Sequence, residues 1–178
     1  MKGFKCYIVI IATLAFGSGN LFAQHILATK MTDVNVPLQH GYQTLLNALE
    51  VADLEDVLAK SGPFTVFAPS DAAFKQIDAA DFAALLKPER QYELRSLLTY
   101  HIVAGKLTAS GILRALSRGK GAARFTTVQG EELLATLEGS DIILTDCSGN
   151  QARIVDADMN RDNLVFHQID RVILPSPL

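Results

Sequence analysis

An acidic run near the end of the sequence has the residue types that bind calcium. Oxygen-bearing side chains alternate along it, at Asp156, Asp158, Asn160 and Asp162. A calcium loop of this spacing needs Gly at its sixth position and a bidentate Glu at its twelfth. Arg161 and His167 stand at those two positions. We therefore interpret the run as a polar turn and predict neither a metal site nor a bound cofactor.

Histidine and serine side chains give no catalytic pattern. The sequence has four histidines, at His25, His40, His101 and His167. None has the i, i+4 spacing of a helical zinc site. His101 and His167 lie in apolar runs, where we expect a ring nitrogen bonded to backbone or to a carboxylate. Ser70 lacks the Gly-x-Ser-x-Gly elbow of a nucleophile, and helix capping explains it. We predict a protein that is not an enzyme and has no catalytic residues.

Four positively charged residues lie within residues 114–124, namely Arg114, Arg118, Lys120 and Arg124. In an acidic chain, such a basic patch favours an anionic polymer, for example a cell-envelope polysaccharide. Solvated cations that complement the dipole of a helix C-terminus explain the same pattern. Both interpretations stay open on the sequence alone.

The first half of the sequence reads mostly as helix. Leucine spacing predicts helical turns between Gly41 and Lys60, and Gly62-Pro63 ends them. A strand is expected over residues 64–68, with Ser70 or Asp71 capping a helix over 72–77. Further helices are expected over residues 79–86, after Pro88, and over 109–116. Residues 99–103 read as a strand because they are β-branched and aromatic.

Strands dominate after Gly121. We expect them over residues 125–128, 133–137, 142–145, 152–155 and 164–174, separated by Gly, Ser, Asp and Asn clusters. Helices that come first and strands that come later indicate an α+β fold rather than a parallel doubly wound sheet. Cys147 lies at one of the predicted turns. We favour a half-buried thiol there over an exposed thiol that could serve dimerisation.

The beginning of the chain has the layout of a secretory signal peptide. Lys2 and Lys5 precede eleven apolar residues, and residues 21–23 form a candidate cleavage site. The apolar run is shorter than the ~20 residues of a membrane-spanning helix. This segment also explains much of the mean hydropathy of +0.21. We predict a signal peptide over residues 1–23 and one domain over 24–178, secreted or periplasmic after cleavage.

Composition supports one compact domain. The 178 residues are 49% apolar and 20% charged, with a net charge of −3, which argues against disorder and against a strongly basic nucleic-acid binder. After removal of residues 1–23, Cys147 is the single cysteine, so stability must come from packing rather than from an internal disulfide.

Three motifs resemble the fasciclin (FAS1) domain family. They are GPFTVFAPSDAAF over residues 62–74, LLTYHIV over 97–103 and NLVFHQIDRVILP over 163–175. They occur in the family's order and together cover residues 32–175. We identify the chain by this resemblance as a secreted, single-domain, bacterial member of the family.

The resemblance implies a wedge-shaped β-sandwich with a cluster of short α-helices. It also implies a non-catalytic adhesion or interaction module that binds a cell-surface or matrix partner. The family's recognition regions correspond here to exposed residues near Tyr100, His101, Asp158 and Met159. The alternative is a periplasmic binder of an anionic polysaccharide or small ligand at the basic patch of Arg114, Arg118, Lys120 and Arg124. We expect no nucleic-acid partner, no transmembrane segment in the mature chain, and a monomer.

Overall fold

A computed structural model describes residues 41–161 and 163–176 of the chain. These residues belong to one compact unit, Val36–Leu178. The predicted signal peptide and its cleavage site lie outside the described residues. No helix among residues 41–161 and 163–176 is long and apolar enough to cross a membrane.

Short helices fill most of the first half, as the apolar spacing predicts. They are α2 (Gln43–Val51), α3 (Glu55–Lys60), α4 (Asp71–Phe74), α5 (Ala79–Leu85), the 3-10 turn η2 (Pro88–Arg90), α6 (Gln91–Tyr100) and α7 (Ala109–Arg118). Ser70 caps α4, because its hydroxyl oxygen accepts a hydrogen bond from the Ala73 amide at 3.2 Å. Capping satisfies one of the amides that a helix start leaves free. The predicted role of Ser70 is confirmed.

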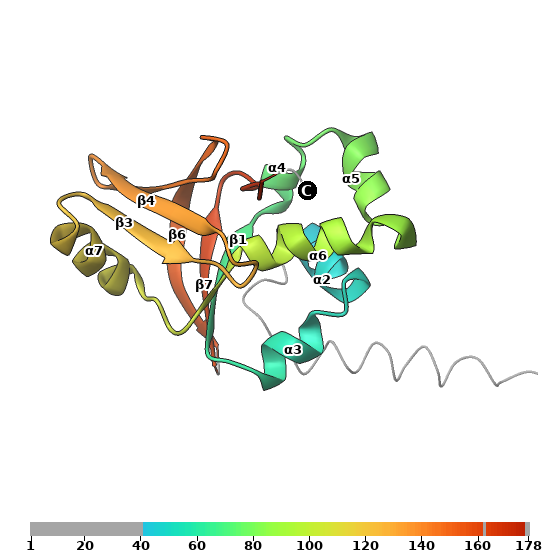
Figure 1. Ribbon diagram of the computed structural model, residues 1–178, viewed down its shortest axis with the longest axis horizontal. Helices are drawn as coiled ribbons and strands as arrows, with labels where there is room; N and C mark the ends of the chain where they lie inside the picture. Colours follow the sequence, from blue (N-terminus) through green and yellow to red (C-terminus); the bar gives the residue numbers. More distant parts are fainter. Residues whose placement is uncertain (1–40, 162, 177–178) are drawn as a thin grey trace, which may run out of the picture. The chain divides into compact units, whose positions relative to one another are not determined.

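Seven strands form one sheet in the order β2-β1-β7-β6-β5-β4-β3. Their bounds are β1 (Phe64–Pro69), β2 (Ile102–Ala104), β3 (Ala122–Thr126), β4 (Glu132–Glu138), β5 (Asp141–Thr145), β6 (Gln151–Arg161) and β7 (Leu164–Ile169). Only the β1–β7 pair is parallel. A bridge between Val103 and Thr127 brings the two ends of the sheet together, so the sheet curves nearly into a barrel (Figure 1).

Strand β1 is buried on both faces and divides the core. Val66 and Ala68 pack with α2, α4 and α6, whereas Phe67 packs with α7, β4 and β5. Successive side chains of a strand point to opposite faces, so a continuous apolar run is needed to bury both. This explains why residues 64–69 read as an unbroken apolar strand. The α+β class, with its strands and its cluster of short helices, is confirmed.

Several predicted bounds are wrong. The helix expected over 72–77 covers Asp71–Phe74, and the strand expected over 125–128 covers Ala122–Thr126. Helix α6 continues through Tyr100, and the following strand covers only Ile102–Ala104 rather than residues 99–103. The acidic run is not a turn, because β6 extends through Arg161 and pairs with β7. The last strand ends at Ile169 instead of continuing to Leu174. In these last three cases, pairing or packing with distant residues overrides the local pattern.

Candidate functional site

Tyr100 and His101 lie in the core. Tyr100 is the last residue of α6, His101 is its C-cap, and their exposed fractions are 0% and 2%. The expectation that both residues lie on a strand over 99–103 is therefore wrong. A helix that continues through residue 100 turns both side chains inward.

His101 is a buried hydrogen-bonding residue, as we expected of a histidine in an apolar run. Its Nδ1 lies 2.8 Å from the Leu97 carbonyl oxygen, and its Nε2 lies 3.2 Å from the Ile173 amide nitrogen. The carbonyl can only accept and the amide can only donate, so the neutral tautomer with the proton on Nδ1 satisfies both. Burial lowers the pKa of His101 to about 4, although the hydrogen bond to Leu97 opposes this shift. The ring therefore joins α6 to the segment after β7.

The Tyr100 hydroxyl serves a second internal connection. It donates to the Glu132 carbonyl oxygen at 3.2 Å and accepts from the Cys147 amide at 3.3 Å. Burial raises the pKa of Tyr100 to about 12. Tyr100 thus holds the turn between β5 and β6 against α6, and it contributes to structure rather than to an exposed surface.

The turn that carries Cys147 is fixed by Asp146. The Asp146 carboxylate accepts hydrogen bonds from the amides of Ser148, Asn150 and Leu174, at 2.8 to 3.0 Å. This places Cys147 at the surface, where its Sγ lies 3.5 Å from the Leu174 carbonyl oxygen. The expectation of a half-buried thiol is wrong, because the turn presents the side chain outward.

Asp158 lies on β6 and has a structural contact of its own. Its Oδ1 accepts from the Ala109 amide at 2.7 Å, at the first residue of α7. Its own amide donates to Nδ1 of buried His167 at 3.3 Å, and His167 Nε2 donates to the Leu107 carbonyl oxygen at 2.7 Å. Desolvation lowers the pKa of His167. Asp158 therefore anchors α7 to β6 while it remains exposed.

The outer half of β6 forms the most accessible strand surface near Asp158. Val155 is 50% exposed, and Asp156, Asp158 and Asn160 are exposed, whereas Ala157 and Met159 are half-buried. Met159 packs against the helical part of the core. β6 pairs with β5 only through Gln151–Arg153 but with β7 as far as Arg161. No described strand pairs with the other edge of residues 155–161.

The sequence analysis placed Asp158 and Met159 in a candidate recognition region but interpreted the segment as a turn rather than as a strand. The signal was nevertheless present, because polar residues at 156, 158 and 160 alternate with Ala157 and Met159. A period of two is the pattern of a half-buried strand.

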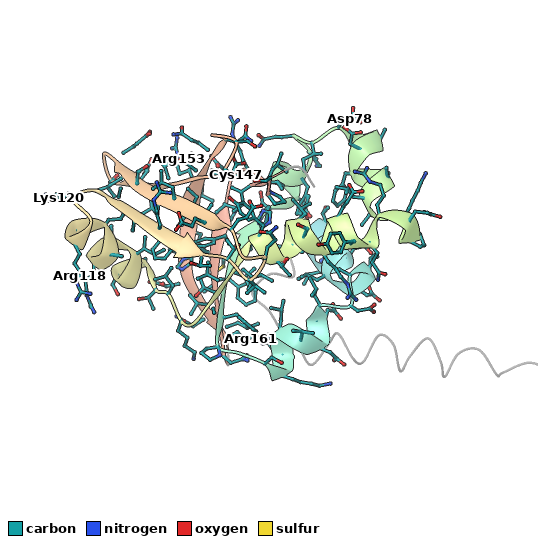
Figure 2. The ribbon with its side chains drawn as sticks, viewed as in Figure 1. Asp78, Arg118, Lys120, Cys147, Arg153 and Arg161 are labelled. Carbon is teal, nitrogen blue, oxygen red and sulfur yellow. The ribbon has the colours of Figure 1, made fainter. Side chains whose placement is uncertain are left out.

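The predicted basic patch is exposed but not uniform. Arg114 and Arg118 lie one helical turn apart on α7, and Lys120 lies just after it in a left-handed conformation, with φ of 56°. Figure 2 shows Arg118 and Lys120 at the same end of α7. Arg124 forms an ion pair with Glu132 at 3.1 Å, so its charge is partly neutralised. No acidic side chain among residues 41–161 and 163–176 forms an ion pair with the other three.

The candidate residues lie in separate groups. Within residues 41–161 and 163–176, no direct hydrogen bond or ion pair joins Tyr100 or His101 to Asp158, or any of these three residues to the basic patch. No group of three or more His, Cys, Asp or Glu side chains in the described part of the chain is arranged to hold a metal ion. The geometry offers exposed surfaces for contact with a partner.

A family model for the fasciclin domain matches residues 40–175. The chain belongs to the fasciclin domain family. It is 36% identical over 134 residues to protein sll1483 of Synechocystis, covering 75% of this chain and 67% of that protein. It is also 36% identical over 137 residues to the uncharacterized protein sll1735 of Synechocystis, covering 75% of this chain and 89% of that protein. The resemblance seen in the three motifs is confirmed, with bacterial relatives.

The fold agrees with a solved FAS1 domain pair from the insect cell adhesion molecule fasciclin I. The TM-score is 0.53 at 23% identity, and the similarity covers 78% of this chain and 45% of that one. The predicted fasciclin-like α+β fold is thus confirmed, with the strands of the expected β-sandwich joined in one curved seven-stranded sheet beside the short helices. The molecule is a fasciclin-type module.

Proposed function

We propose that this fasciclin domain is a secreted, non-catalytic interaction module that binds a cell-surface or matrix partner through the outer half of β6. The name of the insect cell adhesion molecule with the same fold supports the adhesion class. The signal-peptide pattern over residues 1–23 supports export. The choice of surface rests on the exposed side chains at β6 positions 155, 156, 158 and 160. This part of β6 pairs with β7 on one edge, and no described strand pairs with its other edge.

Side chains rather than backbone make this surface suitable for recognition. The register of β6 against β7 shifts twice, between Ile154 and Asp156 and between Asp156 and Met159. Asp158 adopts a left-handed conformation with φ of 62°. Bulges and charged side chains hinder the addition of another strand to a free edge. A partner would therefore contact Val155, Asp156 and Asn160, with Val155 as the apolar contact.

The test compares two matched substitutions of exposed valines. Val155 on β6 and Val128 in the turn after β3 are 50% and 44% exposed. Binding of the purified protein to whole cells and to envelope or matrix extracts is measured as a saturation curve. We expect Val155→Glu to abolish saturable binding and Val128→Glu to retain it, because only the first places a charge in the proposed contact. Equal binding by the two variants, or no saturable binding by the wild type, would contradict the proposal.

The second candidate is an anionic polysaccharide bound at Arg114, Arg118 and Lys120. Its support is the exposure of these three cations and the absence of acidic partners for them in the described residues. Exposed charges are screened over about 10 Å at 0.1 M salt. Binding through this patch should therefore disappear at moderate salt and in the Arg118→Glu variant. Binding through β6 should survive both changes, which separates the two candidates.

A further inference from the structure

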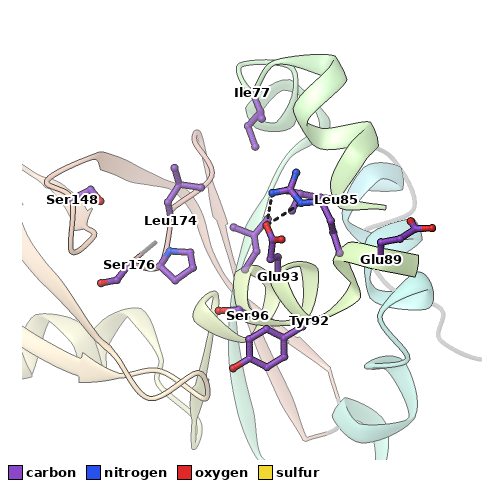
Figure 3. A pocket seen from close by; sticks show the side chains of 12 residues that line it. Ile77, Leu85, Glu89, Tyr92, Glu93, Ser96, Ser148, Leu174 and Ser176 are labelled. Carbon is purple, nitrogen blue, oxygen red and sulfur yellow. Dashed lines mark hydrogen bonds and ion pairs between the residues drawn. The ribbon is translucent and has the colours of Figure 1, made fainter. Parts of the chain in front are cut away.

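An apolar groove lies between α6 and residues 174–176, which follow β7 (Figure 3). Its cavity volume is about 640 Å³. Five apolar side chains contribute to its lining, namely Ile77, Leu85, Leu97, Leu174 and Pro175. Tyr92, with 73% of its surface exposed, also lines the groove. Small-molecule sites have volumes of about 300–1,000 Å³, mostly apolar walls and a few polar groups that orient the ligand.

Ser96 supplies such a polar group. Ser96 lies in the wall of the groove, the residue is only 8% exposed, and its buried Oγ has no hydrogen-bond partner in the described part of the chain. Rotation of the side chain about its Cα–Cβ bond would present this hydroxyl to the groove. Figure 3 shows the Ser96 side chain directed from α6 toward the segment that carries Leu174 and Ser176. Buried hydroxyls are usually satisfied, often by a carbonyl of the preceding helical turn. Thr99 on the same helix does this, donating to the Arg95 carbonyl oxygen at 2.7 Å.

The charges of the groove disfavour an anion. Glu89, Arg90 and Glu93 line one part of it. The Arg90 guanidinium is hydrogen-bonded to the Glu93 carboxylate, so its charge is already engaged. Glu89 adds a further carboxylate at the same surface. A negatively charged head group would meet this carboxylate without a free cation to balance it.

We propose that the groove binds a small neutral amphiphile, with an alkyl chain or ring against the apolar wall and a hydroxyl or carbonyl hydrogen-bonded to Ser96 Oγ. The Ser96 hydroxyl can donate or accept, so either head group satisfies it. This site is separate from the outer half of β6, because Val155 does not line the groove.

The experiment is an NMR titration of the isotope-labelled protein with 1-octanol and, separately, with octanoate. We expect saturable shifts of the groove amides with 1-octanol, and weaker binding of octanoate because of its charge. Ser96→Ala should weaken octanol binding about fivefold, the effect of losing one hydrogen bond. Leu174→Ala should also weaken it, because this exposed side chain forms part of the wall.

Matched controls separate the groove from the rest of the protein. Ser117→Ala removes a helical hydroxyl that is already bonded to the Leu113 carbonyl oxygen. Leu113→Ala truncates a leucine that is 43% exposed, against 42% for Leu174. Both variants, and Val155→Glu, should bind octanol like the wild type. Shifts that do not saturate, shifts outside the groove, or an unchanged affinity in Ser96→Ala would overturn the proposal.

Discussion

The His101 ring occupies the core between α6 and residue 173, with both nitrogens bonded to backbone groups. Protonation would add a proton to Nε2, which accepts the Ile173 amide. The charged ring would therefore lose one hydrogen bond and remain buried without solvent. Burial, which deprives the charged ring of its hydration, is the main reason that the pKa of His101 lies below that of a free imidazole.

Acid should destabilise the protein between pH 7 and pH 5. The pKa of His101 is about 4 when folded and 6.5 when unfolded, so in this range the unfolded chain binds more protons. The free energy of unfolding is therefore lower at pH 5 than at pH 7, by about 2 kcal/mol from His101 alone. The lowered pKa of His167 acts in the same direction. Urea unfolding at pH 7 and pH 5 measures this difference in the free energy of unfolding. The difference should be smaller in His101→Asn, because the Asn amide can form hydrogen bonds but does not titrate. Equal stability at pH 7 and pH 5 in the wild type would contradict this account.

Asp158 makes a second residue-scale prediction. Its carboxylate accepts the first amide of α7, whereas the neighbouring Asp156 carboxylate bonds only the next amide along the chain, that of Ala157. Asp158→Ala should lower the free energy of unfolding by about 1 kcal/mol or more, because the Ala109 amide loses its acceptor and because Ala tolerates the left-handed conformation at this position less well than Asp. Asp156→Ala should leave it nearly unchanged. Thermal unfolding of both variants measures their stabilities. A similar loss of stability in both would show that the contact between Asp158 and Ala109 contributes nothing specific.

At the scale of elements, the turn between β5 and β6 holds the segment that follows β7. Asp146 bonds the Leu174 amide, and His101 bonds the Ile173 amide. The segment has no strand partner along these residues, so side chains from two other elements satisfy its amides. This explains why β7 ends at Ile169 while residue 173 is still buried.

Replacing Asp146 by Ala should release this segment. The variant loses three backbone contacts, and we expect stability to fall by roughly 2 kcal/mol because buried amides lose their acceptor. Hydrogen exchange at the Leu174 amide should accelerate more than exchange in β1. Asp146→Asn, which keeps one acceptor oxygen, should lie between the variant and the wild type. Unchanged protection at Leu174 would show that the segment is held by other contacts.

Local sequence patterns predict a helix or strand correctly where its own apolar residues or its own cap determine how it packs. Leu45 and Leu49 on α2, Ser70 before α4 and the apolar run of β1 are examples. The patterns fail where contacts with residues far away in the sequence determine the local conformation. Thr99 and Tyr100 favour a strand locally, yet Tyr100 stays helical and its hydroxyl bonds Glu132 and Cys147. The Ser96 groove could not be predicted, because its second wall comes from residues 174–176, far along the chain.

At the scale of the whole molecule, counting the reactive thiols tests whether the predicted signal peptide is removed. Cys147 is exposed, and Cys6 lies within the predicted signal peptide. A secreted chain cut near residue 23 should therefore react with one equivalent of a thiol reagent under native conditions. An oxidant should give a disulfide-linked dimer that Cys147→Ser abolishes. Two modified cysteines in the exported protein would contradict cleavage of the predicted signal peptide.

The parallel pairing of β1 with β7 has a consequence for biosynthesis. Phe64 pairs opposite Leu164 and Pro69 opposite Ile169, so one hundred residues separate partners that must meet. Contacts between residues so distant in sequence form slowly, because closing the intervening loop costs conformational entropy. Strand β1 cannot complete its pairing with β7 until the chain has been synthesised past residue 169. A growing chain therefore cannot complete its sheet until β7 has been made, which leaves the edge of β1 that pairs with β7 free during synthesis.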